Sequence, residues 1–101
     1  MQIKIGPILY DVLEVHELCG EAGSLCGDLN TSRTRIRINA DDDSQVQVVT
    51  LWHEILHGIL YTAGIRDHDE RLIDALAHGL VQVISDNPEI IPTFDARVET
   101  E

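Results

Sequence analysis

The residues of this sequence best suited to chemistry are His53, Glu54 and His57, which form a His-Glu-x-x-His pattern. On a helix, positions i and i+4 share one face, so the two imidazoles would point at the same ion. Imidazole nitrogens are common zinc ligands, and a neighbouring carboxylate can take a proton from a water that the ion activates. The pattern therefore predicts a zinc site with Glu54 as the general base.

The third ligand is expected in the next element, because a catalytic zinc site has three protein ligands and an open position for water. Glu70 and Asp74 form a Glu-x-x-x-Asp pattern there. Together with His-Glu-x-x-His, this pattern resembles the gluzincin metallopeptidases over residues 50–80. The resemblance implies that Glu70 is the third ligand and that Asp74 orients a ligand histidine. His68 stays open as a ligand that replaces or joins Glu70.

The chain also departs from the large gluzincins. Twelve residues separate His57 from Glu70, and the chain has no room for the C-terminal helical domain that supplies substrate pockets and a transition-state histidine in that family. If this chain acts in the same way, Tyr61 or His78 would have to stabilise the transition state in place of that histidine. The layout of a small sheet followed by two helices also resembles small zincin-like proteins encoded by phages and bacterial mobile elements.

The zinc motif lies in a segment predicted to be a helix over residues 44–63. Acidic residues 41–43 suit its N-terminus and Gly64 suits its C-terminal end. Apolar residues surround a narrow polar stripe made of Thr50, His53, Glu54, His57 and Tyr61. A helix this apolar is expected in the core, where buried histidine and glutamate cost several kcal/mol unless they are paired or bind metal.

A second helix is predicted over residues 68–85, with Asp67 as its N-cap and Asn87-Pro88 ending it. Its expected buried face consists of Leu72, Ile73, Leu76, Leu80, Val83 and Ile84. Gly79 is unfavourable inside a helix, so close packing against a neighbour near Gly58 or Ala75 is the expected compensation. In the tail, residues 87–101, Ile90, Ile91 and Phe94 are candidates for docking onto the domain.

The N-terminal segment, residues 1–40, reads as strands. Residues 3–15 predict a hairpin around Gly6-Pro7, residues 16–25 a loop, and residues 26–30 a further strand. In residues 33–39, arginines alternate with threonine and isoleucine, which predicts a strand with one basic and one apolar face. The basic face is a solvated surface or the rim that meets an acidic partner or substrate. This strand is also expected beside the cleft, where it would pair with an extended peptide.

These elements predict an α+β domain spanning residues 1–101. A small, mostly antiparallel sheet of three to four strands (residues 2–39) would pack on the two long helices, as in a minimal zincin-like fold. The helical half that carries the metal site would cover residues 44–86.

Composition limits the partners. The formal net charge of −11 disfavours nucleic acid and anionic membranes. No apolar run has membrane-spanning length, and the first residues lack a signal-peptide layout, which predicts a cytoplasmic protein. The resemblance to the small zincin-like proteins implies that the cell is a bacterium or a phage-infected host. Cys19 and Cys26 are expected to be free thiols. The oligomeric state stays open.

Three functions remain from the sequence. The first is a minimal zinc metallopeptidase acting on a peptide or protein substrate. The second is a non-catalytic zincin-fold protein for binding or regulation, with a structural metal. The third is a metal-dependent ribonuclease, since a bacterial RNA-processing family has a related three-histidine pattern. His68 lies too far from His57 for that pattern, and Glu54 stands where that family usually has glycine.

Overall fold

The computed structural model describes residues 1–93 and begins with the predicted hairpin. Strands β1 (Gln2–Ile5) and β2 (Ile8–Val15) pair antiparallel, with Ile5 opposite Ile8. Gly6 adopts a φ of 57° in the turn, a conformation that glycine accepts without steric cost. The hairpin is therefore confirmed, with Gly6-Pro7 at its turn.

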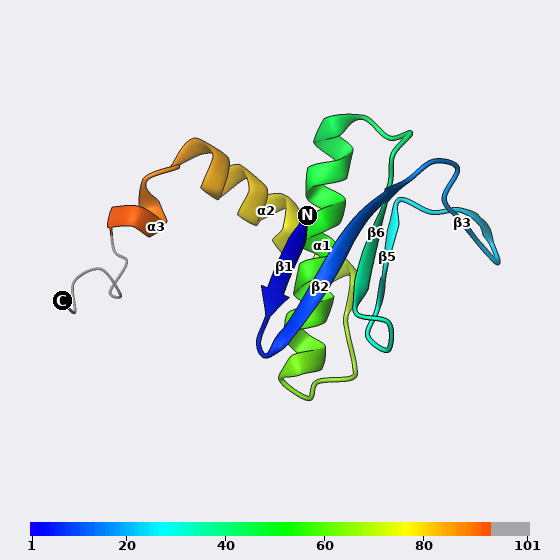
Figure 1. Ribbon diagram of the computed structural model, residues 1–101. Helices are drawn as coiled ribbons and strands as arrows, with labels where there is room; N and C mark the ends of the chain where they lie inside the picture. Colours follow the sequence, from blue (N-terminus) through cyan, green and yellow to red (C-terminus); the bar gives the residue numbers. More distant parts are fainter. Residues whose placement is uncertain (94–101) are drawn as a thin grey trace.

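The main sheet has four strands in the order β1-β2-β6-β5 (Figure 1). Strands β5 (Gly27–Asn30) and β6 (Arg35–Asn39) pair antiparallel, whereas β2 and β6 run parallel. The predicted α+β class with a small, mostly antiparallel sheet is thus confirmed. The strand predicted from residue 33 begins two residues later, because residues 31–34 form a turn in which Thr34 has a φ of 51°.

Two strand predictions were wrong. Residues 16–25 contain a two-stranded sheet of β3 (Cys19–Gly20) and β4 (Gly23–Ser24), where a loop was expected. Strand β6 lies between β2 and β5, so its backbone is already paired on both sides. It therefore has no free edge for a peptide. Period-two alternation identifies a strand and its two faces but carries no information about its neighbours.

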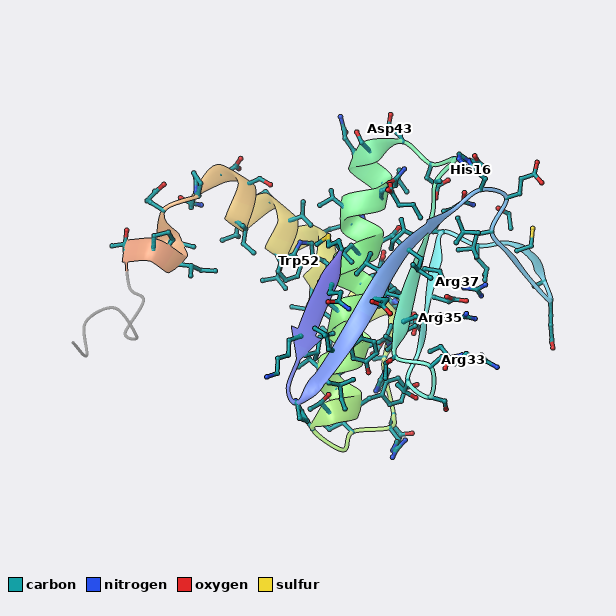
Figure 2. The ribbon with its side chains drawn as sticks, viewed as in Figure 1. His16, Arg33, Arg35, Arg37, Asp43 and Trp52 are labelled. Carbon is teal, nitrogen blue, oxygen red and sulfur yellow. The ribbon has the colours of Figure 1, made fainter. Side chains whose placement is uncertain are left out.

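The core lies between the sheet and helix α1 (Ser44–Thr62). Ile36 is fully buried and Ile38 is 3% exposed, and both belong to one cluster with Ile5, Tyr10 and Ile55. The arginines of the same strand face the other way, as the alternation predicts. Figure 2 shows Arg33, Arg35 and Arg37 on the side of the sheet away from α1, and Arg37 forms an ion pair with Asp28. The basic face is thus partly neutralised by its own sheet.

Helix α1 has the predicted ends but is only half enclosed. The Asp43 side chain accepts a hydrogen bond from the Gln45 N–H, and Gly64, with a φ of 81°, turns the chain after the last turn. Val46, Val48 and Ile59 are between 39% and 47% exposed, so the expectation of a fully buried helix was wrong. One sheet layer covers one side of the helix, and α2 covers only part of the rest.

Helix α2 (Glu70–Asp86) begins two residues later than predicted. Its N-cap is Asp69, which accepts hydrogen bonds from the N–H groups of Arg71 and Leu72, and Asp67 lies outside the helix. The start of α2 lies beside α1, and its C-terminal half extends away from the sheet (Figure 1). The later start leaves His68 in the connecting segment, free of helical geometry.

The predicted buried face of α2 is largely solvent-exposed. Ile73 and Ala77 are buried, whereas Leu72, Leu76 and Val83 are 57%, 47% and 40% exposed. Ile90 and Ile91, the first two residues of the short α3 (Ile90–Thr93), are also exposed, so their expected docking was wrong. Phe94 lies outside the described residues. None of the described helices is long and apolar enough to cross a membrane.

The cysteines are free thiols, as predicted. Cys19 and Cys26 are both exposed at the surface and form no disulfide with each other.

Two glycines give opposite predictions for stability. A Cβ at Gly27 would lie 2.6 Å from Thr50 Cγ2 and 2.7 Å from the Arg37 carbonyl oxygen, so Gly27→Ala should cost about 1–3 kcal/mol through overpacking of β5 against α1. Gly79 has open space around its Cα, contrary to the expected close packing. Gly79→Ala should therefore stabilise α2 by about 0.5–1 kcal/mol. Urea unfolding of both variants measures the two effects, and a stable Gly27→Ala protein would contradict the packing of β5 on α1.

Candidate metal centre

Helix α1 brings His53 and His57 together, as their spacing predicts. Their Nε2 atoms lie 3.2 Å apart, and the side chains are only 20% and 13% exposed. Residues four apart lie one turn above each other on the same face of the helix. Both rings therefore present a nitrogen to one point beside α1.

Glu70, the first residue of α2, faces both histidines across the gap between the helices. Its Oε1 lies 2.8 Å from His57 Nε2, and its Oε2 lies 3.2 Å from His53 Nε2. The carboxylate is 65% exposed, so it reaches the histidines from the solvent side. His53, His57 and Glu70 thus lie close enough together to hold a metal ion.

The separations of these donor atoms fit one small ion. In a tetrahedral zinc site with bonds of about 2.0–2.1 Å, neighbouring ligand atoms lie roughly 3.3 Å apart. The three measured separations, between 2.8 and 3.2 Å, are close to that value. Two nitrogens and a carboxylate oxygen also make up one of the donor sets found in catalytic zinc sites.

Asp74 lies one turn after Glu70, where the sequence predicts an orienting residue. Its Oδ1 is 3.5 Å from His53 Nδ1, the ring nitrogen that faces away from His57 and Glu70. An outer carboxylate at this nitrogen fixes the tautomer of a ligand histidine and raises its basicity. His78 lies nearby on the same helix, 63% exposed, with its Nδ1 hydrogen-bonded to the Asp74 carbonyl oxygen.

Glu54 is buried next to the donor group and is 8% exposed. Burial raises the pKa of its carboxyl from the ordinary 4.5 to about 7, and the charges of Asp28 and Glu70 add to this effect while His53 opposes it. Within residues 1–93, no hydrogen-bond donor pairs with this carboxylate. Glu54 is therefore a buried acceptor with a pKa near neutrality.

His53 and Glu54 form part of the wall of a cavity of about 580 Å³ between β5, α1 and α2. Its other lining residues are Cys26, Gly27, Gln45, Val46, Val49, Thr50, Asp74 and His78. Sequence reasoning identified the motif residues and His78 but missed the lining from β5 and from the first turns of α1. No sequence pattern marks these residues, because they meet only through the packing of β5 on α1.

Tyr61 and His68 lie on the other side of His57, away from this cavity. His68 Nδ1 is 2.7 Å from His57 Nδ1, and the His68 and Tyr61 ring centroids are 4.4 Å apart. Burial lowers the pKa of the His57 imidazole, which favours the neutral form that binds metals. His68 therefore contacts the Nδ1 side of the His57 ring and is not among the three grouped donors, His53, His57 and Glu70.

No protein-family model, curated protein or solved structure matches this chain. The gluzincin resemblance thus depends on the motif residues alone.

Removal of the Glu70 carboxylate tests whether the three grouped side chains bind a metal ion or lie together by chance. In Glu70→Ala, we expect the zinc affinity to fall by more than about 100-fold, beyond the range typical of outer partners, because a direct ligand is lost. Glu89→Ala, which removes an exposed carboxylate from the turn between α2 and α3, is the matched control and should bind zinc normally. Competition with a coloured chelator measures both affinities. Equal affinities would contradict the assignment of Glu70.

Proposed function

We propose that this protein is a minimal zinc-dependent peptidase whose site consists of His53, His57, Glu70 and Glu54. The observation that carries the proposal is the grouping of three metal donors, one of which, His53, lines a cavity together with the buried carboxylate of Glu54. A bound zinc ion would supply a Lewis acid that lowers the pKa of a water molecule and polarises a carbonyl group. His53, His57 and Glu70 would hold the ion, which leaves a position open for substrate and water.

Glu54 is the general base in this proposal. A base works best when its pKa is near the operating pH, and burial raises the pKa of Glu54 to about 7. Its carboxylate can take a proton from the attacking water and pass it to the leaving amine. His53, which would hold the metal, and Glu54 line the same cavity, so the base and the ion would act on one bound substrate.

The substrate strand would bind along β5. Within the described residues, β5 pairs with β6 on one side, and no strand pairs with its other edge. Gly27, the first residue of this strand, and Cys26 just before it line the same cavity as Glu54. A free strand edge beside a catalytic site can add an extended peptide through backbone hydrogen bonds. This arrangement favours a peptide substrate and gives β5 the role first expected of β6.

His78 is the better candidate for stabilising the transition state. It lines the cavity, whereas Tyr61 packs beside His68 on the other side of His57. A donor must lie within reach of the developing charge, so cavity lining favours His78 over Tyr61.

The contacts of His68 argue against the alternative of a closed, structural metal site. A fourth ligand is needed to close the site, but His68 Nδ1 is engaged with His57 Nδ1. The ribonuclease alternative is opposed by the net charge of −11 and by the absence of lysine and arginine from the residues that line the cavity.

The test combines metal analysis with cleavage. Purified protein should contain about one zinc per chain by elemental analysis, and it should cleave unstructured peptides in a reaction that a chelator stops and added zinc restores. RNA serves as the comparison substrate. A protein without zinc would overturn the proposal. Zinc binding without cleavage of any peptide would favour the structural role, and cleavage of RNA alone would favour the nuclease.

A further inference from the structure

We propose that His68 is a positioning residue for the metal ligand His57. By accepting a hydrogen bond from His57 Nδ1–H, His68 holds the His57 Nε2 lone pair toward His53 and Glu70. The inference rests on the metal site of the proposed function and adds a residue outside the Glu-x-x-x-Asp pattern. It also answers whether His68 replaces or joins Glu70 as a ligand, since it does neither.

The direction of the hydrogen bonds follows from one backbone carbonyl. His68 Nε2 lies 2.7 Å from the Ile65 carbonyl oxygen, which can only accept, so His68 Nε2 carries the proton. When that proton is the only one on the ring, Nδ1 is bare, and this atom lies 2.7 Å from His57 Nδ1. His57 must therefore donate from Nδ1, which leaves its Nε2 bare.

The bare His57 Nε2 lies next to two groups that a metal ion or a proton would bridge to it. It lies 2.8 Å from Glu70 Oε1 and 3.2 Å from His53 Nε2. Two acceptors at such distances repel each other unless a positive ion or a proton lies between them. The two hydrogen bonds, from His68 to the Ile65 carbonyl and from His57 to His68, thus leave the Nε2 atom of His57 without a proton and able to bind a metal ion.

The fold holds this series in place at the end of α1. The Gly64 and Ile65 N–H groups donate to the carbonyl oxygens of Tyr61 and Leu60, which fixes the chain where it leaves the helix. The His68 ring lies against Tyr61, with centroids 4.4 Å apart, and its centroid lies 4.9 Å from that of His57 with the two ring planes 24° apart. Because α2 begins only at Glu70, the backbone at His68 is free to turn its ring back toward α1.

His57 and His53 would then be oriented by different partners. Asp74 Oδ1 lies 3.5 Å from His53 Nδ1, so the outer partner of His53 is a carboxylate, whereas that of His57 is the His68 imidazole. Loss of an outer partner typically weakens metal binding by roughly 10- to 100-fold. The same loss is expected when His68 is removed.

The experiment compares zinc affinity in His68→Leu, His68→Gln and His16→Leu. We expect a roughly 10- to 100-fold weaker zinc affinity in His68→Leu, which removes the acceptor. His68→Gln retains an acceptor oxygen and a donor N–H and should regain most of the affinity. His16→Leu removes an exposed histidine at the far end of the sheet and should bind zinc as the wild type does. Chelator competition measures all three.

Nitrogen NMR supplies a readout that a merely structural role would not change. In zinc-loaded protein labelled with ¹⁵N-histidine, a scalar coupling should connect the Nδ1 atoms of His57 and His68 across the hydrogen bond. If His68→Leu does not fold, this wild-type measurement and His68→Gln decide the question. A missing coupling would overturn the inference.

The outcomes separate this inference from the proposed function. Tight zinc binding by the wild type with unchanged affinity in His68→Leu would overturn the role of His68 alone. A far larger loss, together with an altered cobalt absorption spectrum, would make His68 a direct ligand and also overturn it. A wild-type protein that binds no zinc would overturn the proposed function itself.

Discussion

Glu54→Gln should retain its zinc and lose peptidase activity by roughly 10²- to 10⁴-fold, the range typical for removal of a general base. Glutamine has nearly the same shape as glutamate but cannot accept the proton of the attacking water. None of the three grouped donors is changed, so metal binding should be preserved. Zinc content and the rate of peptide cleavage, measured on the same preparation, check both parts of this prediction.

The control for Glu54→Gln is Glu21→Gln, which neutralises an exposed carboxylate in the turn between β3 and β4. This variant should cleave peptides at the wild-type rate. If Glu54→Gln also retained full activity, Glu54 would not be the base. If it lost zinc together with activity, the loss would reflect the metal site and not proton transfer.

In the metal-free protein, Glu54 should make stability depend strongly on pH. Its pKa is about 7 in the folded state, against 4.5 for an ordinary glutamate. Below the ordinary value, both states are protonated and the contribution to stability is fully present. As the pH rises toward 7, the unfolded state ionises first, and the contribution is lost. The difference corresponds to roughly 3 kcal/mol.

Urea unfolding of metal-free wild type and Glu54→Gln at pH 5 and pH 8 measures this effect. The variant should gain stability relative to the wild type between the two pH values. His57 acts in the opposite direction, because its lowered pKa removes stability as the pH falls below 6.5. Its contribution is common to both proteins and cancels in the comparison. A difference that does not change with pH would show that Glu54 is not desolvated.

The candidate metal-binding motif could be predicted from the sequence because its geometry is local. The i and i+4 spacing places His53 and His57 together on any helix, and the pattern that follows identified Glu70 and Asp74. The alternation of arginine and isoleucine likewise predicted which side of β6 is buried. Each of these inferences needed only the residue periodicity of a single helix or strand.

Other features depend on contacts between distant elements. The edge position of β5 follows from the parallel pairing of β2 with β6, which no local pattern encodes. Asp67 and Asp69 are both suitable N-caps, and the path of the connecting segment decides between them. The role of His68 follows from that choice, because a helix beginning at residue 68 would have made its backbone helical.

The weak attachment of α2 has a consequence for the site as a whole. His53 and His57 belong to the helix that packs on the sheet, whereas Glu70 belongs to a helix with only Ile73 and Ala77 buried. A bound ion would therefore act as a cross-link between a firmly held part of the domain and a lightly held one. Metal occupancy and local order of α2 then form a single linked equilibrium, in which each favours the other.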